Sequence, residues 1–202
     1  MENRKTGAFS ILAISPVSKL MGVAVASGST AVGDRVPYAR PGIGVIATQA
    51  YTNVAYGING LALLTKGLAP KETLNRLLME GSEKELRQVA IMDFKKRKAV
   101  FTGAKTPEFH GELVGEDYAV VGNSLTRKEM VNSMAEQFVN SSGDLAHRLA
   151  IALKVGSESG GDKRGEKSAA LIVVGTEKVR AEIKVDVHEN PIEELCRKLR
   201  IL

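Results

Sequence analysis

The chain has 202 residues, which is enough for one substantial domain and too few for two domains of ordinary size. Hydrophobic residues make up 44% and charged residues 25% of the sequence, which is typical of a globular protein and excludes a disordered or fibrous one. The net charge is +5, but the basic residues stand mostly beside acidic ones, so the charge alone does not indicate nucleic-acid binding.

The first half of the chain predicts strands followed by helices. Apolar runs separated by turn residues predict strands over 8–14, 20–27 and 42–50. Leucines at a spacing of three or four residues, each series followed by glycine, predict helices over 58–66 and 70–79.

The second half repeats this grouping. Strands are expected over 88–94, 99–102 and 117–121, and then helices over 127–139 and 145–155. A last hairpin is expected over 168–175 and 179–187, before a closing helix that begins at Pro191. The grouping of strands and the pairing of helices argue against a doubly wound parallel sheet, which would need regular β–α alternation. We expect an α+β protein with two antiparallel sheets packed together and helices outside them.

Three polar segments stand at the ends of the predicted buried strands, over 27–35, 47–57 and 157–168. Their glycines would allow backbone N–H groups to approach a ligand or form a small anion-binding nest. The pair Gly160-Gly161 is equally consistent with an ordinary turn, so these segments indicate a candidate site without defining its chemistry.

Several short stretches occur together in a fixed order, at 9–11, 22–27, 31–33, 47–49, 87–89, 101–103, 118–123, 160–165 and 168–171. In this combination the chain resembles a family of uncharacterised bacterial and archaeal proteins, a domain of unknown function placed among the N-terminal-nucleophile (Ntn) hydrolases. The resemblance runs from Ala8 to the C-terminus. It implies a four-layer αββα sandwich like a proteasome β-subunit, and a homo-oligomer. We therefore expect a flexible segment over 1–7 and a single Ntn-hydrolase-like domain over 8–202.

The resemblance also directs attention to the start of the first strand. Ntn hydrolases use a Thr, Ser or Cys at the mature N-terminus, and its free α-amine takes the proton from its own side chain. Family members often have Thr-Phe-Ser here, whereas this chain has Ala8-Phe9-Ser10. Thr6 is the remaining candidate nucleophile and would require cleavage after Lys5, although self-processing relatives tend to have glycine at that point. The alternative is that the residues before the strand form a disordered tail without a catalytic role.

Six polar residues are candidates for substrate binding: Ser27, Thr48, Gln49, Asp162, Arg164 and Ser168. Ser27 would orient the substrate or the amine, and Thr48 and Gln49 would donate hydrogen bonds to an oxyanion. Arg164 would clamp a carboxylate, with Asp162 fixing its guanidinium group. A purely structural network is the alternative for each of them. Asp34 and Arg35 are expected to form a surface ion pair.

The basic run Lys95–Lys98 lies between two predicted strands and indicates a charged hairpin turn. RNA binding is the alternative, but no aromatic stacking pattern accompanies the run, so nucleic acid is not expected as a partner. The three histidines have no metal-binding spacing, and no nucleotide-binding motif is present. We therefore expect no metal and no other cofactor.

The single cysteine, Cys196, has no partner for an intramolecular disulfide, which suits a reducing compartment. No apolar run has the length of a membrane span or the pattern of a signal peptide, so we expect a cytoplasmic protein. The function we expect is Ntn-type hydrolysis of an amide bond in a small polar metabolite or peptide. The alternative is a non-catalytic ligand-binding or assembly protein that retains the fold.

Overall fold

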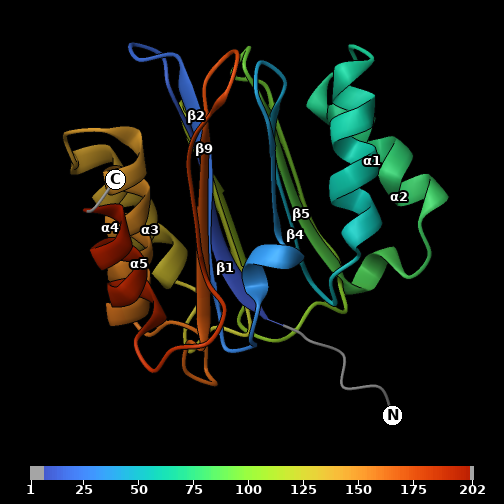
Figure 1. Cartoon of the computed structure of the whole chain (residues 1–202). Coiled ribbons are helices and arrows are strands. Elements are labelled where there is room, and N and C mark those ends of the chain that lie inside the picture. The colour runs from blue at the N-terminus through green and yellow to red at the C-terminus, as the bar shows by residue number, and fades with distance from the viewer. Residues whose placement is uncertain (1–6, 201–202) are drawn as a thin grey trace.

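The computed structural model describes residues 7–200, and this part of the chain contains two antiparallel sheets and five α-helices (Figure 1). The larger sheet has the order β10-β9-β2-β1-β8-β7, formed by β1 (Ala8–Ser15), β2 (Leu20–Ser27), β7 (Gly111–Val114), β8 (Tyr118–Asn123), β9 (Ser168–Val174) and β10 (Val179–Val185). The smaller sheet has the order β3-β4-β5-β6, formed by β3 (Pro37–Arg40), β4 (Gly44–Ala50), β5 (Arg87–Asp93) and β6 (Lys98–Thr102). The predicted α+β class with two antiparallel sheets is confirmed.

The helices divide between the two sheets. The four-stranded sheet packs against α1 (Val54–Thr65) and α2 (Pro70–Glu80). The six-stranded sheet packs against α3 (Met130–Asn140), α4 (Leu145–Glu158) and α5 (Pro191–Leu199). Figure 1 shows these two groups of helices on opposite sides of the molecule, with both sheets between them. Within residues 7–200 no helix is long and apolar enough to cross a membrane.

Strand β1 shows why the central strands are apolar on both faces. Its Phe9 and Ile11 belong to the cluster packed with α3 and α4, whereas Leu12 and Ile14 belong to the cluster between the two sheets. Successive side chains of a strand point to opposite faces, so a strand covered on both sides needs apolar residues at nearly every position. Ser10 is the exception within β1, since it is fully buried and polar.

The structure contains two strands that the sequence pattern did not predict, β3 and β7. Each has four residues and lies at an edge of its sheet, so neither carries the long apolar run of a buried strand. Helix α1 begins at Val54 rather than at residue 58 because Asn53 caps it, with its side-chain oxygen accepting a hydrogen bond from the Ala55 N–H. Helix α4 extends to Glu158, so the polar loop that follows it is shorter than expected.

The basic run Lys95–Lys98 forms a hairpin turn around Asp93. The Asp93 carboxylate accepts the backbone N–H groups of two residues of the turn and forms an ion pair with Arg97 at 2.6 Å. Lys96 forms an ion pair with Asp117, also at 2.6 Å. The turn is therefore the charged hairpin that the sequence indicates, and much of its positive charge is paired within the chain.

Candidate functional site

The site is built around Gly7, which precedes β1, and Ala8, which is the first residue of β1. The Gly7 carbonyl accepts hydrogen bonds from Ser27 Oγ at 2.6 Å and from Arg164 Nη2 at 3.1 Å. Only glycine fits here, because its φ is +84° and a Cβ atom would lie 2.4 Å from Arg164 Nη2 and 2.8 Å from the Ser124 side chain. Two donors and a close approach of neighbouring atoms therefore fix the backbone at residue 7.

Arg164 is itself held by Asp162. The Asp162 carboxylate is fully buried and accepts from Arg164 Nε at 2.8 Å and from Arg164 Nη2 at 2.6 Å. It also accepts from the backbone N–H groups of Arg164 and Gly28. This bidentate, charge-assisted pair orients the guanidinium group and joins the loop after α4 to the end of β2.

Ser168, the first residue of β9, holds the loop that follows β2. Its Oγ donates to the Ser29 carbonyl at 2.5 Å and accepts from the Val32 N–H at 3.1 Å. Arg164 Nη1 donates to Ser29 Oγ at 3.2 Å from the other side. The loop over 28–31 is therefore fixed beside Gly7 by β9 and by the loop after α4.

A second polar cluster lies between the sheets and fixes the Ala8 carbonyl. Gln49 Nε2 donates to this carbonyl at 3.1 Å, and Asn123 Nδ2 donates to it at 3.4 Å. Both amides also donate to Gln88 Oε1, at 2.7 and 2.9 Å. Ser10 Oγ donates to Gln49 Oε1 at 2.6 Å. All five residues are almost fully buried, so the start of β1 is held by amides from both sheets.

Gln88 and Asn123 were not predicted as site residues. Both stand within stretches that carry the family resemblance, and both are polar residues in otherwise apolar strands. Gln88 Nε2 donates in addition to the carbonyls of Gly111 and Gly122, which ties β5 to the neighbouring sheet. The signal in the sequence was a polar residue in a strand with no solvent-exposed face.

Of the predicted site residues, Ser27, Gln49, Asp162, Arg164 and Ser168 gather at this end of β1. Thr48 does not join them, since its Oγ1 donates to the Asn53 carbonyl at 3.2 Å next to the start of α1. Thr48 and Gln49 are consecutive in β4, so their side chains point to opposite faces of the sheet. Thr6 lies outside the described residues. The Ala8 side chain is 1% exposed.

The predicted ion pair of Asp34 with Arg35 is wrong. Asp34 instead pairs with Lys184 at 3.0 Å, and Arg35 Nη2 donates to the Thr30 carbonyl at 3.4 Å. Burial lowers the pKa of Arg35, and the nearby positive charge of Arg164 lowers it further. The two sequence neighbours therefore have different partners, and that of Asp34 is a lysine of strand β10.

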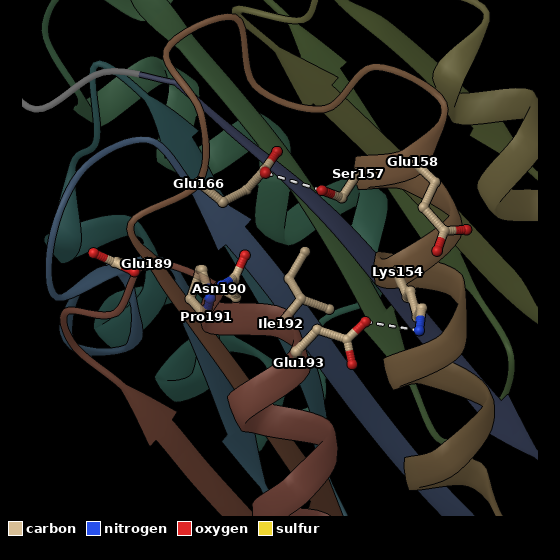
Figure 2. Close-up of a pocket in the computed structure, with 9 residues that line it drawn as sticks. All are labelled: Lys154, Ser157, Glu158, Glu166, Glu189, Asn190, Pro191, Ile192 and Glu193. Atoms are coloured by element: carbon tan, nitrogen blue, oxygen red, sulfur yellow. Dashed lines mark hydrogen bonds and ion pairs between the residues drawn. The ribbon is translucent and has the colours of Figure 1, made fainter.

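A pocket of about 170 Å³ lies between α4 and the start of α5, and Glu166 from the loop after α4 lines it. Figure 2 shows Glu166 and Ser157 joined by a hydrogen bond and Lys154 paired with Glu193. The second oxygen of Glu166 accepts from the Asp162 N–H at 2.9 Å. Glu166, which lines this pocket, thus supports the loop that contains Asp162.

Comparisons with known proteins place this architecture in a family. Residues 8–195 match the model of a family of unknown function, DUF1028. Protein SPO2555 from Silicibacter pomeroyi is similar in structure, with a TM-score of 0.91 and 30% sequence identity over 97% of this chain and 86% of that one. The chain belongs to the DUF1028 family.

More distant structural likeness extends to Anbu proteins. Anbu (ancestral beta-subunit) from Yersinia bercovieri has a TM-score of 0.45 and 10% identity, covering 96% of this chain and 93% of that one. Anbu from Hyphomicrobium sp. strain MC1 has a TM-score of 0.44 and 9% identity, covering 96% and 94%. No curated protein matches the chain.

Proposed function

We propose that the chain is an Ntn-type amide hydrolase that acts on a small polar metabolite or peptide through Thr6. The observation that carries this proposal is the double clamp on the Gly7 carbonyl by Ser27 and Arg164. Thr6 is bonded directly to Gly7, so its amine and hydroxyl start within one peptide unit of this polar cluster. The fixed Gly7 backbone is therefore the point from which an amine exposed at Thr6 would extend.

The arrangement of layers supports the same assignment. Helices α3, α4 and α5, the six-stranded sheet, the four-stranded sheet, and helices α1 and α2 succeed one another, with a buried apolar cluster at each contact between them. We propose that this order is that of the four-layer αββα sandwich that Ntn hydrolases use. Strand β1 is central in the larger sheet, and its first residue stands at the polar cluster.

The proposed reaction needs only the Thr6 residue as nucleophile and base. After hydrolysis of the Lys5–Thr6 peptide bond, Thr6 Oγ1 attacks the substrate carbonyl carbon and passes its proton to the Thr6 amine. Collapse of the tetrahedral intermediate breaks the substrate C–N bond, and the leaving amine takes that proton. Water then hydrolyses the Thr6 ester, releasing the carboxylic acid and restoring the hydroxyl.

A non-catalytic ligand-binding or assembly protein is the second candidate, and the residue at position 8 favours it. The Ala8 methyl group is buried where the family resemblance expects a threonine hydroxyl. The amides of Gln49 and Asn123 are directed to the chain's own Ala8 carbonyl. In this candidate the cluster stabilises the strand and presents a binding surface without chemistry.

Release of amine from a panel of N-acetyl amino acids and dipeptides distinguishes the two candidates. We expect Thr6→Ala to abolish hydrolysis and Thr176→Ala, which removes an exposed hydroxyl in the turn between β9 and β10, to leave it unchanged. Hydrolysis that survives in Thr6→Ala would exclude Thr6 as the nucleophile. Absence of hydrolysis in a chain that begins at Thr6 would favour the non-catalytic candidate.

A further inference from the structure

We infer that Arg35 and Arg164 together form a binding site for one carboxylate group, beside the start of β1. This inference rests on the proposed function in one respect: the ligand is then the substrate, an N-acyl amino acid or short peptide with a free carboxylate. The binding site itself follows from the two arginines and the loop that lies between them.

Both guanidinium groups approach the loop over 28–31, which follows β2. Arg164 reaches it from the loop after α4 and donates from Nη1 to Ser29 Oγ at 3.2 Å. Arg35 reaches it from the short turn η1 (Val32–Asp34) and donates from Nη2 to the Thr30 carbonyl at 3.4 Å. The two cations therefore meet at adjacent residues of one fixed loop, although they are far apart in the sequence.

Arg35 forms no ion pair with another residue of 7–200, although the negative charge of Asp34 acts on it and favours its charged form. Its neighbour Asp34 is engaged by Lys184, and its Nε atom is buried without a hydrogen-bond acceptor in the described part of the chain. A buried donor without an acceptor is unfavourable, and so is a second guanidinium group held nearby. The nearby charge of Arg164 lowers the pKa of Arg35, as does its burial. An anion bound between the two groups would offset the repulsion between them.

The local charge fits one negative charge. Arg35, Arg164 and Lys184 contribute three positive charges and Asp162 and Asp34 two negative charges, which leaves a net charge of +1. A carboxylate balances this charge and matches the planar fork of a guanidinium group. A phosphate group of about −2 would exceed it. Because Arg164 Nη2 also donates to the Gly7 carbonyl at 3.1 Å, the bound carboxylate would lie close to Gly7.

The test is an NMR titration that follows the Nε–Hε resonances of Arg35 and Arg164. It is performed in the Thr6→Ala chain, so that the ligand is not consumed and failure of the binding site is separated from failure of the hydrolase. The probe is N-acetylglycine. N-acetylglycinamide serves as the matched ligand without a carboxylate, and inorganic phosphate as the alternative anion.

We expect N-acetylglycine to shift both resonances in a saturable manner and N-acetylglycinamide to leave them in place. Arg35→Gln should weaken binding roughly tenfold or more, since it removes a charge-assisted interaction. Arg40→Gln removes an exposed guanidinium group in β3 and should leave the affinity unchanged. Arg35→Lys should also bind more weakly, because it keeps the charge but lacks the planar fork.

Three results would overturn the inference. The first is that the Nε–Hε resonance of Arg35 in the Thr6→Ala chain does not shift on saturation with N-acetylglycine. The second is equal affinity of the Arg35→Gln and Arg40→Gln chains. The third is tighter binding of inorganic phosphate than of N-acetylglycine, which would assign the site to a dianion. The chemical-shift measurement uses the Thr6→Ala chain with Arg35 in place. It is therefore unaffected if the arginine variants misfold.

Discussion

Replacement of Asp162 by alanine tests whether this carboxylate organises the site. Asp162 is the fully buried member of the pair with Arg164 and also accepts the buried N–H of Gly28. Asp162→Ala leaves that N–H without an acceptor and frees the guanidinium group, so the loop after α4 should detach from the end of β2 and from Gly7.

The magnitude follows from the two groups left behind. An unsatisfied buried N–H costs about 1–3 kcal/mol. Arg164 is 32% exposed, so it can turn toward water, and its contribution falls well below the roughly 3–5 kcal/mol lost when one partner of a fully buried ion pair is removed. We expect a total loss of about 3 kcal/mol in the free energy of unfolding. For a chain of this length, that corresponds to a decrease of about 6–12 °C in Tm.

Equilibrium unfolding in urea, followed by circular dichroism, measures this loss as a lower midpoint at an unchanged slope. Asp162→Asn retains an acceptor for Gly28 and should lose about half as much. Asp186→Ala, which removes an exposed carboxylate, should remain within about 0.5 kcal/mol of the unmodified chain. A loss below about 1 kcal/mol in Asp162→Ala would refute the view that this carboxylate holds the site together.

Three further outcomes are expected. Gly7→Ala should lower the Tm more than Gly67→Ala does. Both glycines have positive φ, but of the two only residue 7 would bring the new Cβ into contact with other atoms. Equal decreases in Tm would contradict this. Gln88→Leu should lose about 2 kcal/mol or more in urea unfolding, because it leaves buried amide donors unpaired, and a near-neutral change would show that the inter-sheet network does not stabilise the fold. The Cys196 thiol should react with a disulfide reagent at pH 8 more slowly than free cysteine, because burial raises its pKa, and a rate equal to that of free cysteine would contradict this.

The strands and helices with a clear apolar pattern were predictable from the sequence. Leu20–Ser27 and Ser168–Val174 carry continuous apolar runs because both faces of each strand are covered, and they appear as β2 and β9. Strand β3 was missed because Pro37–Arg40 has no apolar pattern typical of a strand. It forms a strand by pairing with β4. Pairing in an edge strand depends on its neighbour, which a local window of sequence does not contain.

The site was only partly predictable for a related reason. Alternation along β4 separates Thr48 from Gln49, but this requires knowledge of which face meets the other sheet. Asp34 pairs with Lys184, 150 residues away, so adjacency to Arg35 in the sequence was misleading. The sequence indicated where the polar segments lie, at the ends of predicted strands. The partner of each side chain depends on the tertiary fold and could not be predicted from the sequence.

The most direct test of the proposed function is the mass and N-terminal sequence of the intact chain isolated from cells. We expect a chain that begins at Thr6, with a free amine one residue before the clamped Gly7. A chain that retains Lys5 or any earlier residue would have no N-terminal nucleophile at this site, and would contradict the proposed hydrolase.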